Sequence, residues 1–319
     1  MKKTKLPMGK IPPEVLKNVV FKHLGVKNPN VILGPALGMD SAVIKVGEKV
    51  LIYSMDPITG AKERIGWLAV NINANDVATF GIRPSLFSAC ILLPEKSTEK
   101  TVEEICVQID LAAKRLGIAV IGGHSEVTPK MKNPIIVGCA MAITDPGKYV
   151  TSAGSKPGDK IILTKGAGLE GTAVIANEKR ETLKTAINDD LLNSAMNFYE
   201  KISVVQEAVL AYNFGGVTAM HDPTEGGLLG GIHELADASE LGVKIYKEKI
   251  YVHRETMEIC RFFKIDPMQL ISSGALLISA NPNFAEGIIQ ELSKNNIKAA
   301  VIGEFTKDPS KRMLIHEDG

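Results

Sequence analysis

The sequence lacks any strong excess of charge and any long apolar run. Its formal net charge is +1, so electrostatics alone gives no case for nucleic acid or an anionic membrane as a partner. No apolar stretch approaches the roughly 20 residues that cross a bilayer. The basic start at residues 1–5 leads into Pro7 and Gly9 rather than into an apolar signal core, so we predict no secretory signal.

Closely spaced cysteines are absent as well. The four cysteines lie far apart, without a CxxC pair, at Cys90, Cys106, Cys139 and Cys260. Because they occur in strand-like or helix-like segments rather than in a metal or redox motif, we interpret them as buried free thiols. This pattern predicts a reduced, cytoplasmic location.

A nucleotide-binding P-loop is also missing, since GxxxxGK[ST] does not occur. The glycines of Lys165-Gly-Ala-Gly-Leu-Glu-Gly171 do not fit GxGxxG, although free N–H groups at a helix start could attract phosphate there. Ser272-Ser-Gly274 could bind a phosphate or simply turn the chain. Gly122-Gly-His-Ser-Glu126, after a predicted strand, adds His124 and Glu126, for which a site role and a structural role stay equally open.

The chain does have core material for two domains, since 45% of its 319 residues are hydrophobic. Both halves mix strands with helices, which favours two α/β or α+β domains. Residues 145–160 are rich in Gly, Pro, Ser and Lys, so we expect domains at 1–148 and 149–319. Predicted strands occupy 31–33, 42–46, 50–55, 86–93, 118–121, 135–143, 161–164, 218–220, 243–246, 275–278 and 299–302. Predicted helices occupy 12–25, 63–80, 98–116, 169–176, 189–212, 228–238, 254–263 and 283–295.

The predicted helix 63–80 is apolar nearly all round, which is typical of a buried helix. It nevertheless carries Asn71, Asn73, Asn75 and Asp76. A buried carboxylate needs a charged partner, hydrogen bonds or a metal ion. We therefore predict a ligand site here, and the alternative is a polar network that fixes helix packing.

Three further carboxylates flank predicted strands, in segments that contain glycine. Asp40 precedes a strand, whereas Asp56 and Asp222 each follow one. Carboxylates in such places can jointly hold Mg²⁺ on a polyphosphate. Each alone could be a turn former or a helix cap, and their occurrence together with Asp76 is what favours a site.

Five motifs, in order along the chain, resemble a superfamily of ATP-dependent enzymes. It includes aminoimidazole ribonucleotide (AIR) synthetase, selenophosphate synthetase, thiamine-monophosphate kinase and the hydrogenase-maturation protein HypE. The motifs read Gly38-Met-Asp-Ser-Ala-Val-Ile44, Asn75-Asp-Val-Ala-Thr-Phe-Gly-Ile-Arg-Pro84, Gly122-Gly-His-Ser-Glu126, Asp222-Pro-Thr-Glu-Gly-Gly-Leu228 and Ser272-Ser-Gly-Ala-Leu-Leu277. His221-Asp-Pro-Thr and Ser273-Gly-Ala-Leu-Leu are most similar to HypE.

The resemblance implies a two-domain PurM-like fold. Its N-terminal mixed sheet would form a β-barrel with the sheet of a second copy, and its C-terminal domain would be an α+β sandwich. It implies ATP between the domains and Mg²⁺ on Asp40, Asp56, Asp76 and Asp222. These four aspartates are also expected to face the ATP phosphates, and the further residues implied for ATP or phosphate binding are Lys10, Ser41, Asn75, Gly122, Gly123, His124 and Glu126. A homodimer, an unidentified small-molecule substrate and a maturation-protein partner are expected, and the catalytic residues stay unknown.

The sequence departs from the family pattern at three points. HypE ends in a cysteine whose carbamoylated thiol is dehydrated, whereas this sequence ends Leu314-Ile-His-Glu-Asp-Gly319 and is expected to lack that acceptor. Glu225 stands where the family commonly has arginine, which reverses the charge near the expected phosphates. No cysteine lies in the first 89 residues, which disfavours selenophosphate synthetase.

We therefore expect an ATP-binding, Mg-dependent enzyme that activates an oxygen of a small substrate by phosphoryl transfer. It would be a HypE-like maturation factor without the self-carbamoylated cysteine. Three alternatives stay open. They are a nucleotide-binding maturation or regulatory partner with little turnover, a small-molecule kinase resembling thiamine-monophosphate kinase, and a scaffold that binds no nucleotide.

Overall fold

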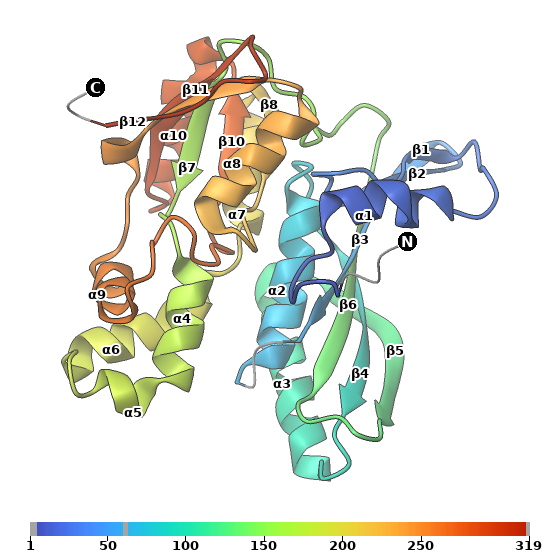
Figure 1. Ribbon diagram of the computed structural model, residues 1–319. Helices are drawn as coiled ribbons and strands as arrows, with labels where there is room; N and C mark the ends of the chain where they lie inside the picture. The colour runs from blue at the N-terminus through green and yellow to red at the C-terminus, as the bar shows by residue number, and fades with distance from the viewer. Residues whose placement is uncertain (1–4, 60–62, 317–319) are drawn as a thin grey trace.

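The computed structural model describes residues 5–59 and 63–316. Two six-stranded sheets, one in each half of the chain, organise these residues (Figure 1). The first sheet has the strand order β1-β2-β3-β6-β4-β5, in which β4 and β5 are parallel and the other neighbours antiparallel. Its strands are β1 (Val31–Leu33), β2 (Ala42–Val46), β3 (Lys49–Ile58), β4 (Leu86–Leu93), β5 (Ala119–Val127) and β6 (Ile135–Thr144).

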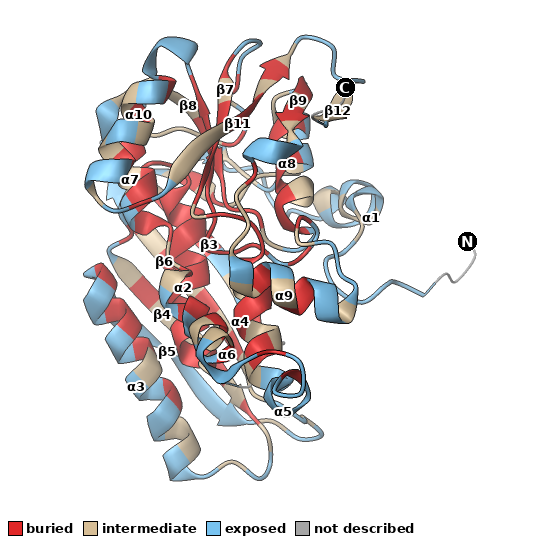
Figure 2. Cartoon of the chain, turned by 90° about the vertical axis from the view of Figure 1, so that its left-hand side faces the viewer, coloured by how far each residue is buried: buried red, intermediate tan, exposed pale blue. Residues whose placement is uncertain are grey.

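Helices α2 (Ile65–Ala78) and α3 (Glu99–Leu116) lie on one side of the first sheet (Figure 1). All 14 residues of α2 are buried, because β3, β6, α3 and a helix of the second half surround it (Figure 2). Helix α3 buries only an apolar stripe, as an amphipathic surface helix does. Thr98 caps its start, and Gly117 ends it in the left-handed conformation.

The second sheet has the order β12-β9-β11-β7-β10-β8 and is antiparallel except between β12 and β9. Ile162, Met220 and Ile278 on one face share a core with α7 and α10, whereas Ile161 and Leu277 on the other face pack with α8. The strands are β7 (Lys160–Thr164), β8 (Val217–His221), β9 (Gly242–Tyr246), β10 (Leu277–Ala280), β11 (Ala299–Thr306) and β12 (Arg312–Ile315). The covering helices are α7 (Val205–Phe214), α8 (Gly227–Ala238) and α10 (Pro282–Lys294).

A smaller helical layer lies beside the second sheet, and a short helical segment opens the chain (Figure 1). The layer has its own apolar core around Leu183, Leu192 and Ile259. It consists of α4 (Leu169–Glu178), α5 (Arg180–Leu183), α6 (Asp189–Met196) and α9 (Arg254–Phe263). The remaining elements are α1 (Pro13–Asn18) and the 3₁₀ turns η1 (Val20–Lys22), η2 (Asn197–Lys201) and η3 (Lys247–Lys249).

Most predicted elements are confirmed, with three informative differences. The first predicted helix, 12–25, is reduced to α1 and a 3₁₀ turn. The predicted helix 189–212 is broken into α6, η2 and α7, because the backbone of 201–204 turns to bond the side chains of Asn75 and Lys165. Strand 118–121 continues to Val127, so Gly122-Gly-His-Ser-Glu126 lies within β5 and not in a turn after it.

The remaining differences concern smaller elements. Strand β12 and helix α5 were not predicted, and β10 begins two residues later than expected. Strand β3 continues to Ile58, so the prediction that Asp56 follows this strand is wrong, because the pairing with β6 extends past Asp56. The first sheet ends at Thr144 and the second begins at Lys160, while the division at 148/149 stays a prediction. Across 5–59 and 63–316, none of the helices combines the length and the apolarity required to cross a membrane.

Candidate functional site

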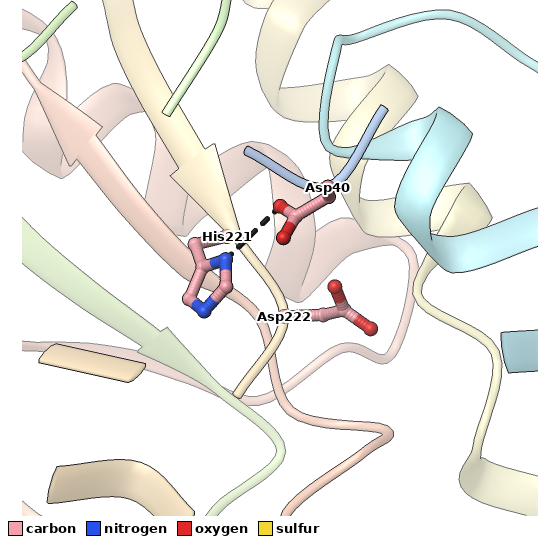
Figure 3. A group of neighbouring side chains, drawn as sticks. All are labelled: Asp40, His221 and Asp222. Atoms are coloured by element: carbon pink, nitrogen blue, oxygen red, sulfur yellow. Dashed lines mark hydrogen bonds and ion pairs between the residues drawn. The ribbon is translucent and has the colours of Figure 1, made fainter. Parts of the chain in front are cut away.

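Four aspartates from four separate segments converge between the two sheets. Asp40 precedes β2, Asp56 lies in β3, Asp76 in α2, and Asp222 directly follows β8. Burial raises the pKa of Asp56, Asp76 and Asp222, and the nearby negative charge of Asp40 contributes to the rise in each. Oxygens of Asp40 and Asp222 and a ring nitrogen of His221 lie within 4.8 Å of one another (Figure 3).

Helix α2 positions two of these aspartates through its own polar side chains. Asp76 accepts a hydrogen bond of 2.5 Å from Ser54 Oγ on β3. One turn earlier, Asn73 Oδ1 accepts from the backbone N–H of Asp56 at 2.8 Å, and its Nδ2 donates to the carbonyl of Asp56 at 3.2 Å. The buried helix therefore fixes both its own carboxylate and the strand that carries Asp56.

Asp222 has the most demanding environment of the four. It is 1% exposed, and both of its carboxylate oxygens are buried without a hydrogen-bond partner among the described residues. Burial raises the pKa of Asp222 well above its ordinary value, and the charge of Asp40 adds to this while that of His221 opposes it. A buried carboxylate without partners is costly, and a bound cation would supply the missing interaction.

His221 links the cluster to a fifth carboxylate. Its Nδ1 lies 3.0 Å from Asp40 Oδ2 (Figure 3). Its Nε2 lies 2.8 Å from Glu234 Oε2. Burial alone would lower the pKa of His221, but the two carboxylates outweigh it and raise that pKa well above the usual value. The imidazolium form therefore donates to both carboxylates and orients Asp40.

The roles of His221 and Glu234 were not predicted from the sequence. The available signal was a histidine at the end of an apolar strand, immediately before an aspartate. A buried histidine needs partners for both ring nitrogens, which predicts a polar environment but does not identify the partners.

The N-terminal segment reaches the same cluster through Lys10. Its backbone N–H donates to Glu225 Oε2 at 2.8 Å, and its Nζ donates to Thr224 Oγ1 at 3.0 Å and lies 3.9 Å from Glu234 Oε1. Burial lowers the pKa of Lys10, but the surrounding carboxylates, Glu234 foremost, bring it above the ordinary value. Lys10 is therefore a cation at the edge of the aspartate cluster.

Ser41 and Asn75 differ in where the fold places them. Ser41 follows Asp40 and is buried, and its hydroxyl lacks a hydrogen-bond partner in the described parts of the chain. Asn75 donates to the carbonyl of Ile202 at 2.9 Å and accepts from the N–H of Val204 at 2.8 Å. These hydrogen bonds fix the packing of α2 against the backbone of 202–204, which is the alternative role predicted for the polar residues of this helix. A part for Asn75 in phosphate binding stays a prediction.

The β5 residues lie apart from the aspartates of the same chain. Gly122, Gly123, His124 and Glu126 occupy this strand, which β4 and β6 separate from β3. His124 Nε2 lies 3.2 Å from Glu126 Oε2, and both side chains are exposed. The fold does not bring them to the cluster, and their role in ATP binding stays a prediction.

The two halves of the chain match known domains. Residues 38–144 match the AIR synthase related protein N-terminal domain, and residues 156–316 match the AIR synthase related protein C-terminal domain. The chain belongs to the AIR synthase related protein family. A putative hydrogenase expression/formation protein of Methanocaldococcus jannaschii is 29% identical over 307 residues, covering 94% of this chain and 89% of that protein.

Solved structures of HypE share the fold of this family member. The crystal structure of a HypE–HypF complex aligns with a TM-score of 0.79 and 20% identity, covering 96% of this chain and 97% of the other. HypE in complex with ATP aligns with a TM-score of 0.72 and 22% identity, covering 98% and 92%. These likenesses confirm the predicted two-domain PurM-like fold. The aspartate cluster draws on both matched domains, because Asp40, Asp56 and Asp76 come from the first and Asp222 from the second.

Proposed function

We propose that this family member is an ATP-binding, Mg²⁺-dependent enzyme that transfers a phosphoryl group to an oxygen of a small substrate. The observation that carries the proposal is Asp222. Its two buried oxygens lack partners within the described residues, and Asp40, Asp56 and Asp76 lie near enough for their charges to interact with it. Structural packing alone gives no reason to gather four carboxylates where two are buried and two partly buried.

The donor set fits magnesium. Mg²⁺ prefers oxygen ligands, and it is usually held by carboxylates together with substrate phosphates. The cluster offers carboxylate oxygens, while both ring nitrogens of His221 are engaged by Asp40 and Glu234. A zinc site would instead call on free imidazole or thiolate ligands. Magnesium bound there would neutralise charge on the nucleotide phosphates.

The residues around the cluster would prepare it for the nucleotide. His221 holds Asp40, and Ser54 holds Asp76, so these two carboxylates need little reordering when a cation binds. Lys10 places its ammonium beside the same carboxylates, where it can contact a phosphate oxygen. We propose that the four aspartates, Lys10 and Ser41 form the MgATP site, and that Asn75 acts by holding α2 in place.

We propose that the phosphoryl transfer to the substrate oxygen is one step in the maturation of another protein. The similar protein of M. jannaschii is named for hydrogenase expression or formation, and HypE has been crystallised with HypF. We therefore propose a HypE-like maturation factor, located in the cytoplasm, with a maturation-protein partner. The proposal uses none of the four cysteine thiols. The prediction that all four are buried is wrong for Cys106, which is exposed on the surface helix α3, whereas Cys260 in α9 is buried and Cys90 in β4 and Cys139 in β6 are partly buried.

Glu225 favours a second candidate, a nucleotide-binding partner with little turnover of its own. Its carboxylate accepts from the backbone of Lys10 and adds negative charge beside the proposed phosphate site. Repulsion of this kind weakens the binding of a γ-phosphate. Turnover of ATP without any added partner protein would favour the enzyme over this candidate.

We also propose that a second copy of the chain covers the first sheet. Met55 and Ile143 are exposed on the face opposite α2, and Ile121 and Val127 are exposed on the edge strand β5. Apolar patches and unpaired edges of this kind are typical of interfaces. In light scattering, Ile143→Glu should convert a dimer to a monomer, whereas Val107→Glu on the outer side of α3 should not. A monomeric wild type would contradict the proposal.

Calorimetric titration with ATP tests the site. We expect wild-type protein to bind ATP at least about tenfold more tightly with Mg²⁺ than with EDTA. Asp76→Asn should abolish this difference, and Asp145→Asn, which alters an exposed ion pair with Lys49, should retain it. ATP binding that needs no Mg²⁺ and is unchanged in Asp76→Asn would contradict the site assignment.

A further inference from the structure

A cavity of about 430 Å³ lies between the two halves of the chain. Asn71 of α2 lines it, together with Lys165 at the end of β7 and Glu207 of α7. Asn71 and Asn75 share one face of α2, while Asn73 and Asp76 share the opposite face. The cavity therefore lies on the side of α2 that faces away from the aspartate cluster.

Positive charge exceeds negative charge around this cavity. The basic lining side chains are Arg83, Arg115, Lys165 and Lys201, and the acidic ones are Glu200 and Glu207. Arg115 pairs with Glu200. Lys165 Nζ lies 2.6 Å from Glu207 Oε1 and donates to the carbonyls of Lys201 and Ser203. Each of the two acids therefore has a basic side chain within ion-pair distance.

Arg83 and Lys201 remain without a carboxylate partner among the described residues. The ammonium of Lys201 lies 4.3 Å from the ring centre of Phe198. Burial lowers the pKa of Lys201, and the charge of Lys165 lowers it further while Glu255 opposes the shift. Such an environment disfavours the ammonium, and an anion in the cavity would relieve it.

We propose that this cavity binds a small phosphate monoester, with Arg83 and Lys201 contacting the phosphate. Two cations without an ion-pair partner among the described residues match the charge of a dianion, and phosphate is a preferred partner of arginine. Asn71 donates its Nδ2 to the carbonyl of Trp67, which leaves its Oδ1 to accept from a hydroxyl of the ligand. Leu210 and Ile297 supply apolar wall, and the volume suits a compact ligand.

The test is a titration of the full chain with ribose 5-phosphate and, separately, with inorganic phosphate. Binding is detected by ³¹P NMR at constant ionic strength. EDTA is present and nucleotide is omitted, so the metal-free aspartate cluster repels both probes. The variants are Lys201→Met and Arg83→Met. Lys114→Met, which removes an exposed lysine that pairs with Asp110 on α3, is the matched control.

We expect saturable binding of ribose 5-phosphate to wild-type protein, with inorganic phosphate weaker because it lacks the sugar hydroxyls. Lys201→Met and Arg83→Met should each weaken binding about tenfold, and the control should stay within about twofold. If Lys201→Met fails to fold, Arg83→Met at its exposed position decides the outcome. No saturable binding to wild type, or equal binding by wild type and Arg83→Met, would overturn the proposal. Neither Mg²⁺ nor nucleotide is present in this assay, so its outcome is independent of the MgATP site.

Discussion

Replacing Asp222 by asparagine should stabilise the metal-free protein and remove its response to magnesium. The substitution keeps the shape of the side chain but removes a charge that has no partner in the described structure. Most substitutions of a fully buried residue destabilise a protein. A gain in stability here would therefore be a specific sign of a carboxylate retained for a ligand.

The expected magnitude follows from the burial of Asp222. Leaving a buried polar group unsatisfied costs about 1–3 kcal/mol, and more when it is charged. Because the pKa of Asp222 is raised in the folded state, the cost is absent at low pH and grows as the pH rises from the ordinary aspartate range through the raised pKa. Asparagine stays neutral throughout. We expect Asp222→Asn to gain about 1–2 kcal/mol at pH 7 in EDTA.

Magnesium should reverse this order. A ligand at 100 times its dissociation constant stabilises the folded state by about 2.7 kcal/mol. Wild-type protein should show a gain of this order in MgCl₂, whereas the variant should gain less than about 1 kcal/mol.

Urea denaturation in EDTA and in MgCl₂, from pH 5 to 8.5, measures both effects. The control is Asp145→Asn, an exposed aspartate whose replacement should change stability by less than about 0.5 kcal/mol. The reasoning is refuted if Asp222→Asn is less stable than wild type in EDTA and still gains the wild-type increment from magnesium.

Three further predictions concern the surroundings of the site. His221→Gln should lower the free energy of unfolding by about 3 kcal/mol at pH 6 and by less at higher pH. Because the pKa of His221 is raised in the folded state, its ion pairs stabilise the fold fully below the ordinary histidine pKa and weaken as pH rises through the raised value. Urea denaturation from pH 6 to 9 measures this, and a loss that does not change with pH contradicts it. Asn75→Ala should lower the free energy of unfolding by about 2–4 kcal/mol, because it removes both hydrogen bonds to the backbone of 202–204. The control Asn18→Ala, at an exposed position, should lower it by less than about 0.5 kcal/mol. Equal losses for the two variants in urea denaturation would contradict the role of Asn75 in holding this segment. Gly123→Ala should cost more than Gly147→Ala in the same assay, since a Cβ at Gly123 would lie 1.9 Å from a backbone oxygen of β4 whereas that at Gly147 meets nothing within 4 Å.

Much of the fold could be predicted from the sequence because local rules act on it directly. The apolar run at 86–93 and the capped helix that ends at Leu116 are confirmed to within a residue. The break in helix 189–212 could not be predicted, since it depends on Asn75, which lies more than 100 residues earlier and bonds the backbone of 202–204. Local propensity contains no information about such a partner.

The candidate site was predictable to the same extent. The sequence predicts a ligand site at Asp76 because a carboxylate in an apolar helix needs a partner. In the fold, the charges of Asp222, Asp56 and Asp40 act on Asp76. His221 was missed because its role depends on which carboxylates the fold brings to its two ring nitrogens. The β5 residues were expected beside the phosphates, yet strand order places two strands between them and β3.

The central claim is that Asp40, Asp56, Asp76 and Asp222 together hold the metal of a nucleotide complex. Crystals grown with Mn²⁺ and a non-hydrolysable ATP analogue test it most directly, because manganese replaces magnesium at oxygen sites and gives an anomalous signal. We predict an anomalous peak within about 2.5 Å of oxygens from Asp222 and at least two of the other aspartates, next to the analogue's phosphates. A nucleotide bound elsewhere, with no manganese at Asp222, would contradict the account.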